Sequence, residues 1–84
     1  MDMHFVYLLQ SLKDNGFYIG YTEDVMSRLN LHNPGKVKST SSRLPLKLIY
    51  FEAYPDKAAA LNREQKLKDF GSSYTGLLKR LGIK

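Results

Sequence analysis

Two basic side chains that can act on a phosphate stand one helical turn apart in this sequence. Arg28 and His32 lie in a segment whose apolar residues repeat with a helical period. On one helix face they could present a fixed positive charge and a titratable base to the same phosphate group. The alternatives are structural: such an arginine usually extends its charged end to solvent, and such a histidine is usually a hydrogen-bonded boundary residue.

A carboxylate interrupts the apolar stripe of a second helical segment. Ala60, Leu61 and Leu67 form that stripe, and Glu64 stands in its middle. In one interpretation Glu64 lies at the edge of the stripe and pairs with a lysine. In the other it points into a cleft and binds a metal ion. A single carboxylate completed by water and substrate oxygens suits Mg²⁺, which keeps most of its hydration.

Tyrosine is abundant, with six residues among 84. Tyr7 lies in one strand-like segment, and Tyr18 and Tyr21 lie in the next. Tyrosine favours strands, so a structural role is one interpretation. The other is that two of these side chains line a site, where their hydroxyls contact a water molecule or a phosphate oxygen.

A hairpin is expected to position the tyrosines. Residues 5–10 and 17–22 have the β-branched and aromatic content of strands, and the Asn-Gly pair at 15–16 favours a two-residue turn. In the register that this turn sets, Tyr7 and Tyr18 point to the same face of the sheet.

The remaining elements alternate in a regular order. We expect a helix after Thr22 or Asp24 that ends at Asn33-Pro34-Gly35, a basic loop over 36–45, a strand over 46–54, a helix over 57–70 between Pro55-Asp56 and Gly71, and a short helix in 72–84. The order ββαβαα predicts an α+β fold, with a small three-stranded, mainly antiparallel sheet flanked by helices.

Composition limits the function classes. The 84 residues predict a single domain over 1–84, and the net charge of +5 at pH 7 suits nucleic acid first and a membrane surface second. No apolar run is long enough to cross a membrane, and the N-terminus has no signal-peptide pattern. Cysteine is absent, which excludes disulfides and zinc–thiolate sites and agrees with a cytoplasmic protein.

A cluster of basic residues brackets the serines and threonines of the polar loop. Short hydroxyl side chains and exposed backbone N–H groups suit phosphate oxygens and carry little sequence information. The alternative is a solvated loop without a partner. The candidate nucleic-acid-binding residues are Lys36, Lys38, Arg43 and Lys47.

The motifs together resemble the GIY-YIG nuclease domain. "FVY" at 5–7 and "YIG" at 18–20 place ten residues between the two tyrosines, and an R-x-x-x-H helix and a distal glutamate follow. "HNPGKVKST", "LPLKLIYFEAY" and "ALNREQKLKDF" are similar to small stand-alone members related to the catalytic module of the excision-repair subunit UvrC. The resemblance implies a three-stranded antiparallel sheet flanked by helices and metal-dependent cleavage of phosphodiester bonds.

The resemblance assigns roles to the tyrosine motifs. Tyr7 would be the general base or would orient the attacking water, and Tyr18 would help to hold the nucleophile or the scissile phosphate. Gly20 would let the chain turn closely beside the site. Phe5 stands where the namesake motif has glycine, and Tyr21 stands where some relatives carry a lysine that touches the phosphate.

The resemblance also assigns roles to the helical residues. Arg28 would stabilise the phosphoryl charge, His32 would assist proton transfer, and Glu64 would hold Mg²⁺ or Mn²⁺. These roles predict a divalent-metal-dependent endonuclease acting on DNA. Two alternatives stay open: a catalytically weak nucleic-acid-binding module on the same scaffold, and an interaction domain whose basic face meets an acidic protein.

Overall fold

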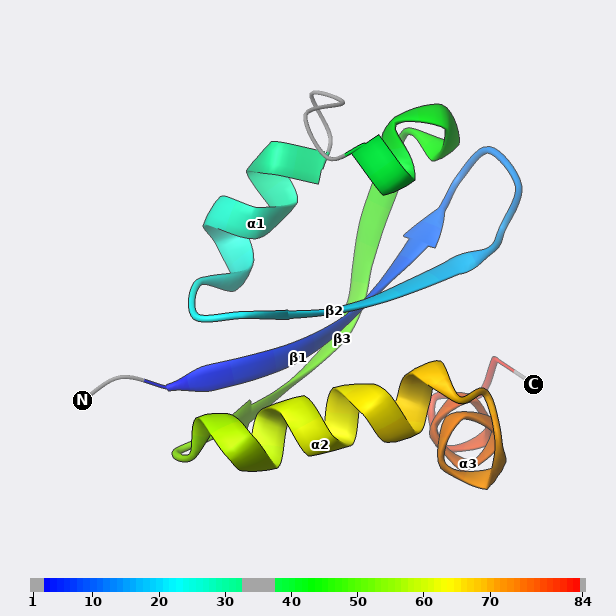
Figure 1. Cartoon of the computed structure of the whole chain (residues 1–84). Coiled ribbons are helices and arrows are strands. Elements are labelled where there is room, and N and C mark those ends of the chain that lie inside the picture. Colours follow the sequence, from blue (N-terminus) through cyan, green and yellow to red (C-terminus); the bar gives the residue numbers. More distant parts are fainter. Residues whose placement is uncertain (1–2, 33–37, 84) are drawn as a thin grey trace.

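The computed structural model describes the backbone of residues 3–32 and 38–83, and their side chains except at 30–32 and 38–40. The described chain forms the predicted ββαβαα order with a short 3₁₀ helix added before the third strand (Figure 1). The elements are β1 (His4–Ser11), β2 (Phe17–Thr22), α1 (Val25–His32), the 3₁₀ helix η1 (Lys38–Arg43), β3 (Leu46–Tyr54), α2 (Lys57–Lys68) and α3 (Ser72–Arg80).

The three strands form one antiparallel sheet with β1 in the centre. The strand order is β2-β1-β3, so β2 and β3 are both edge strands. Figure 1 shows α1 on one side of the sheet and α2 and α3 on the other. The predicted α+β fold is therefore confirmed. None of the helices in the described part of the chain is long and apolar enough to cross a membrane.

The β1–β2 turn is longer than predicted. The Ser11 N–H donates to the Gly16 carbonyl at 2.8 Å, so residues 12–15 form a four-residue turn and the predicted two-residue turn at 15–16 is wrong. The cause is the Ser11 side chain, which is fully buried. Its hydroxyl oxygen accepts hydrogen bonds from two backbone N–H groups of the turn, at 3.1 and 3.2 Å, and so organises the longer loop.

The longer turn changes the register between β1 and β2, but Tyr7 and Tyr18 stay on the same face of the sheet. Tyr7 pairs with Gly20, whereas the two-residue turn would have placed it opposite Asp24. A shift by four residues is even, and strand side chains alternate with a period of two. Tyr7 and Tyr18 therefore still share a face, as the sequence predicts.

The core has a layer on each side of β1. On the side of α2 and α3, buried side chains of β1, β2 and both helices pack together: Val6, Leu8, Ile19, Ala60, Leu67, Leu77 and Leu78. On the side of α1, Tyr7, Leu9 and Leu46 are buried, and Leu29 of the helix packs on them. Because β1 is buried on both faces, the packing around it can hold the polar side chain of Tyr7 in a fixed position.

Side-chain caps set the helix starts. The Asp24 carboxylate accepts from the Ser27 N–H at 3.1 Å, which selects Asp24 from the two predicted N-caps of α1. The Asp56 carboxylate caps α2 in the same way, with the Ala58 N–H as donor at 3.1 Å. These caps fix the helices that carry the candidate basic and acidic residues.

The helix ends differ more from the prediction. α2 ends at Lys68, before the predicted residue 70, because Phe70 adopts a positive φ of 55° that no helix continues through. Gly71, predicted to end α2, is the N-cap of α3. The predicted loop over 36–45 contains η1, and the predicted stop signal at 33–35 lies outside the described residues.

A buried carboxylate ties β3 to α2. Glu52 accepts hydrogen bonds from the hydroxyls of Tyr50 and Tyr54, both at 2.6 Å, and from Arg63 at 2.9 Å, and only 11% of its side chain is exposed. Burial acts to raise the pKa of Glu52, but the hydrogen bonds outweigh it and the pKa is lowered. This network fixes α2 on the sheet and thereby positions Glu64.

Candidate active site

Tyr7 lies at the centre of the candidate site. Its side chain is only 3% exposed, and its ring lies across the backbone of Gly20 in the neighbouring edge strand. A Cβ atom at Gly20 would stand 2.9 Å from Tyr7 Cε2 and still closer to Cζ and the hydroxyl. Gly20 is therefore needed to make room for the phenol ring, which is a different reason from the close turn that the resemblance implies.

Tyr18 joins Tyr7 on the same face of the hairpin. The two ring centroids are 6.3 Å apart and the rings are tilted by 35°. Tyr18 pairs with Leu9 in the register, so the two tyrosines are diagonal neighbours on adjacent strands. The structure thus brings together the two phenols that ten intervening residues separate in the sequence.

Arg28 connects both tyrosines to α1. The interaction of its guanidinium with the Tyr7 hydroxyl is the main reason that the pKa of Arg28 is raised, against the opposing effect of burial, and Tyr18 raises it further. Its Nε atom is buried and has no hydrogen-bond partner among the described residues. Arg28 therefore points inward and stays cationic, with a buried N–H donor that none of the described residues satisfies.

The environment of Tyr7 favours its neutral form. Burial is the largest cause and raises the pKa of Tyr7, and the nearby Tyr18 and Glu64 raise it further. The hydrogen bond with Arg28 and its positive charge act in the opposite direction without cancelling this shift. At neutral pH Tyr7 is therefore a protonated phenol, which can donate a hydrogen bond and accept one.

Glu64 approaches the tyrosines from α2. The Tyr7 ring extends across the edge strand β2, which α2 also contacts, and there the Glu64 carboxylate is close enough to affect the pKa of Tyr7. Glu64 Oε2 also lies 3.1 Å from Lys68 Nζ. Both interpretations from the sequence thus have an observation behind them: Glu64 pairs with a lysine, and its charge acts on the phenol of Tyr7.

The donor set fits a hydrated hard cation. Among the described residues no group of three or more His, Asp or Glu side chains could surround a metal ion. The chain instead offers one carboxylate, beside two phenols and a guanidinium. Mg²⁺ is commonly bound by one or two carboxylates with water and phosphate oxygens as the other ligands, so this set suits Mg²⁺ or Mn²⁺ and not a zinc site.

Three predicted site residues cannot be placed in this arrangement. His32 is the last residue of α1 and Lys38 the first of η1, but both side chains lie outside the described part of the structure. Lys36 lies outside it entirely. Their roles stay predictions, although the backbone of His32 follows Arg28 by one helical turn, as expected.

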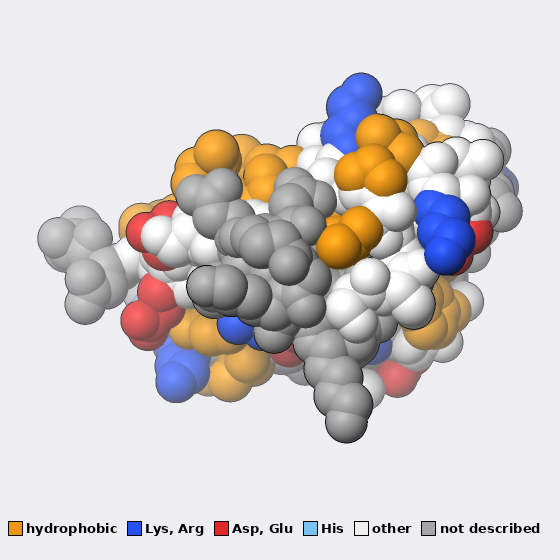
Figure 2. Space-filling view, turned by 90° about the horizontal axis from the view of Figure 1, so that it is seen from above, with side chains coloured by type: hydrophobic (Ala, Val, Ile, Leu, Met, Phe, Trp, Pro, Cys, Tyr) orange, Lys and Arg blue, Asp and Glu red, His pale blue; other side chains and the backbone are white. Residues whose placement is uncertain are grey.

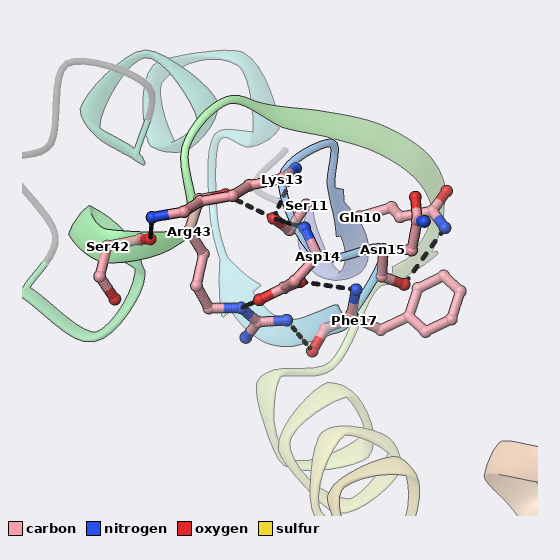
Figure 3. A network of polar contacts seen from close by, with 9 residues as sticks. Gln10, Ser11, Lys13, Asp14, Asn15, Phe17, Ser42 and Arg43 are labelled. Atoms are coloured by element: carbon pink, nitrogen blue, oxygen red, sulfur yellow. Dashed lines mark hydrogen bonds and ion pairs between the residues drawn. The ribbon is translucent and has the colours of Figure 1, made fainter.

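Arg43 has structural partners that the sequence did not indicate. Figure 3 shows its guanidinium between the Asp14 carboxylate, at 3.6 Å, and the carbonyl of Phe17, which accepts a hydrogen bond at 3.2 Å. The Ser11 hydroxyl donates to the Arg43 carbonyl at 2.6 Å. Arg43 therefore holds the end of η1 against the β1–β2 turn. Lys47 is exposed on β3.

On the α1 side of the molecule, the described basic side chains that Figure 2 shows do not form a single cluster. Figure 2 shows the described Lys and Arg side chains of this face at separate points among hydrophobic ones. Met26 and Phe51 are among the exposed large hydrophobic residues. The net charge of +5 favours attraction of a polyanion.

Three comparisons identify similar proteins. The model of the GIY-YIG catalytic domain matches residues 3–77. A UPF0213 protein of Staphylococcus epidermidis is 44% identical over 71 residues, which cover 83% of this chain and 85% of the relative. A UPF0213 protein of Haloquadratum walsbyi is 40% identical over 70 residues, covering 82% and 78%. The solution NMR structure of a UPF0213 protein from Bacillus halodurans has a TM-score of 0.57 and 36% identity, covering 94% of this chain and 84% of that one.

Proposed function

The chain belongs to the GIY-YIG catalytic-domain family, among its small UPF0213 members, and from this membership we propose that it is a divalent-metal-dependent endonuclease that hydrolyses phosphodiester bonds of DNA. One observation carries the proposal beyond the family: a single guanidinium, that of Arg28, interacts with both tyrosines and has a buried N–H without a partner among the described residues. We also propose that residues 1–84 act as one catalytic domain, in the cytoplasm.

Arg28 is the residue that binds the scissile phosphate. Its planar fork of N–H donors matches the oxygens of a phosphoryl group, and the charge on those oxygens grows toward the transition state. The interactions with Tyr7 and Tyr18 orient the guanidinium before substrate arrives. Such preorganisation reduces the reorganisation that the reaction would otherwise require.

Tyr7 orients the attacking water, with Tyr18 beside it. A general-base role would require the phenolate, which burial disfavours because it raises the pKa of Tyr7. A neutral phenol can still hold a water molecule by a hydrogen bond. His32, one turn beyond Arg28 on α1, is then the titratable group that assists proton transfer.

Glu64 holds the divalent ion, Mg²⁺ or Mn²⁺. When bound, such an ion supplies charge stabilisation at the leaving oxygen of the phosphodiester. The effect of the Glu64 charge on the pKa of Tyr7 supports the assignment, because a carboxylate ligand and a water-orienting phenol must both act on the same phosphate.

DNA is the proposed partner, held through its phosphates. The net charge of +5 supplies the attraction, and Lys36, Lys38, Lys47 and Arg43 are the proposed contacts. Of these, Arg43 has protein partners already, so its contribution includes holding η1 in place.

A catalytically weak binding module is the second candidate. The ion pair between Glu64 and Lys68 favours it, since a carboxylate that is neutralised by a lysine does not need a metal ion. Both candidates bind nucleic acid, so only cleavage separates them.

The test is incubation with labelled single-stranded, duplex and branched DNA and with RNA, in Mg²⁺, Mn²⁺ or EDTA. We expect cleavage of at least one DNA substrate that requires the divalent ion. The Glu64→Ala variant should lose cleavage but bind DNA equally well or more tightly, because a negative charge is removed from a phosphate site. A wild-type protein that binds DNA but cuts nothing in either ion would favour the binding module.

A further inference from the structure

The candidate metal ligand already has a cation beside it. Lys68 Nζ lies 3.1 Å from Glu64 Oε2, and both residues belong to α2, four positions apart. A glutamate that precedes a lysine by four residues is the more favourable orientation of such a pair. Only 17% of the Glu64 side chain is exposed, against 45% of Lys68.

We propose that Lys68 is a built-in counter-ion of the metal site, which a divalent ion must displace from Glu64 and which thereby sets the affinity of the site for that ion. The inference rests on the proposed function, because it takes Glu64 as the metal ligand. It adds a residue that touches neither the scissile phosphate nor the attacking water.

The physical basis is competition for one carboxylate. A divalent ion that approaches Glu64 meets the positive charge of Lys68, and this repulsion is only partly screened because Glu64 is mostly buried. Lys68 can leave, since nearly half of its long side chain is exposed and solvent hydrates the ammonium. The pair therefore weakens ion binding without preventing it.

The ion pair also has a benefit for the metal-free protein. Without a counter-ion, the mostly buried Glu64 carboxylate would stand uncompensated near Tyr7, where the pKa of the phenol already responds to its charge. An uncompensated carboxylate would also repel a phosphate that approaches Arg28. Lys68 neutralises the Glu64 carboxylate until a divalent ion replaces it.

Binding of Mn²⁺ alone tests the proposal without measuring activity. Free Mn²⁺ is followed by electron paramagnetic resonance at constant ionic strength in the wild type, Lys68→Met and Lys66→Met. Lys66 is exposed, and residues two apart on a helix do not face each other, so its replacement removes the same net charge without touching the pair. We expect Lys68→Met to bind Mn²⁺ about two- to tenfold more tightly than Lys66→Met. Circular dichroism checks that each variant is folded.

The Glu64→Gln variant tests the metal site separately from the counter-ion. Loss of Mn²⁺ binding in Glu64→Gln, with tighter binding in Lys68→Met, would support both the metal site and the counter-ion. Loss in Glu64→Gln with equal affinities in Lys68→Met and Lys66→Met would overturn the counter-ion alone. Mn²⁺ binding that Glu64→Gln leaves unchanged would place the ion elsewhere and overturn both.

Discussion

Replacement of Gly20 by alanine should act on the site through Tyr7. The added Cβ would stand 2.9 Å from Tyr7 Cε2 and closer to the hydroxyl, so the ring must move away from its position. Gly20 does not have a positive φ, so alanine carries no backbone strain there and the cost is steric. Overpacking of this kind costs about 1–3 kcal/mol of unfolding free energy. In a domain of this size each kcal/mol corresponds to about 4–8 °C in Tm.

A double-mutant cycle isolates the contact. Unfolding free energies are measured by urea denaturation for Gly20→Ala, Tyr7→Val and the double variant. Valine keeps the β-branched preference for strands but has no atoms at the position of the ring. Without the ring, Gly20→Ala should be neutral or stabilising by about 0.4–1 kcal/mol, so the two substitutions should couple by about 1–3 kcal/mol.

Gly76→Ala is the matched control. Gly76 lies in α3, and a Cβ there would meet nothing within 4 Å. Alanine should therefore stabilise the protein by about 0.5–1 kcal/mol through helix propensity alone. An equal cost of Gly20→Ala with and without the Tyr7 ring would refute the packing of Tyr7 across β2, and with it the position of the phenol in the site.

Two further predictions concern electrostatics. The pKa of Glu52 is lowered from its usual 4.5, so its contribution to stability is present above about pH 4.5 and is lost as pH falls through the lower folded pKa. Urea denaturation at pH 7, 5 and 3 should show that the free energy of unfolding depends less on pH in Glu52→Gln than in the wild type. An equal pH dependence in the two proteins would contradict the network. For DNA binding, log K should fall against log salt with a slope of about −2 to −4, and replacing Lys36 and Lys38 together by alanine should flatten it by about two units. Fluorescence anisotropy in a salt series measures both slopes, and nanomolar, salt-insensitive binding would show that the loop reads bases.

Much of the fold follows from local patterns. The bounds of β3 and the N-cap of α2 are as predicted, and the N-cap of α1 is one of the two predicted residues, because alternation, helical periodicity and capping depend on residues close together in the chain. The length of the hairpin turn is not local. It depends on the hydroxyl of Ser11, which is buried by its bond to the Arg43 carbonyl, more than thirty positions away.

The candidate site could also be predicted only where it depends on local patterns. Shared faces could be predicted from the periods of strand and helix, so Tyr7 and Tyr18 meet as expected. Their bonds to Arg28 need the position of α1 on the sheet, which no local pattern gives. The role of Gly20 depends on a side chain of another strand. The partner of Glu64 was detectable in principle, since Lys68 follows it by four residues.

The central claim is that Arg28, positioned by the two tyrosines, binds the scissile phosphate. The rate of DNA cleavage by Arg28→Lys tests this claim most directly. Lysine keeps the positive charge. It lacks the planar guanidinium, whose several N–H donors can reach both phenols and a phosphate oxygen at the same time. With the preferred labelled DNA in Mg²⁺ or Mn²⁺ under single-turnover conditions, we expect the wild type to cleave and Arg28→Lys to be slower by about 10²–10³-fold, the usual effect of losing one transition-state donor. DNA affinity should stay close to the wild-type value, and circular dichroism checks that the variant is folded. A rate equal to that of the wild type would contradict the account.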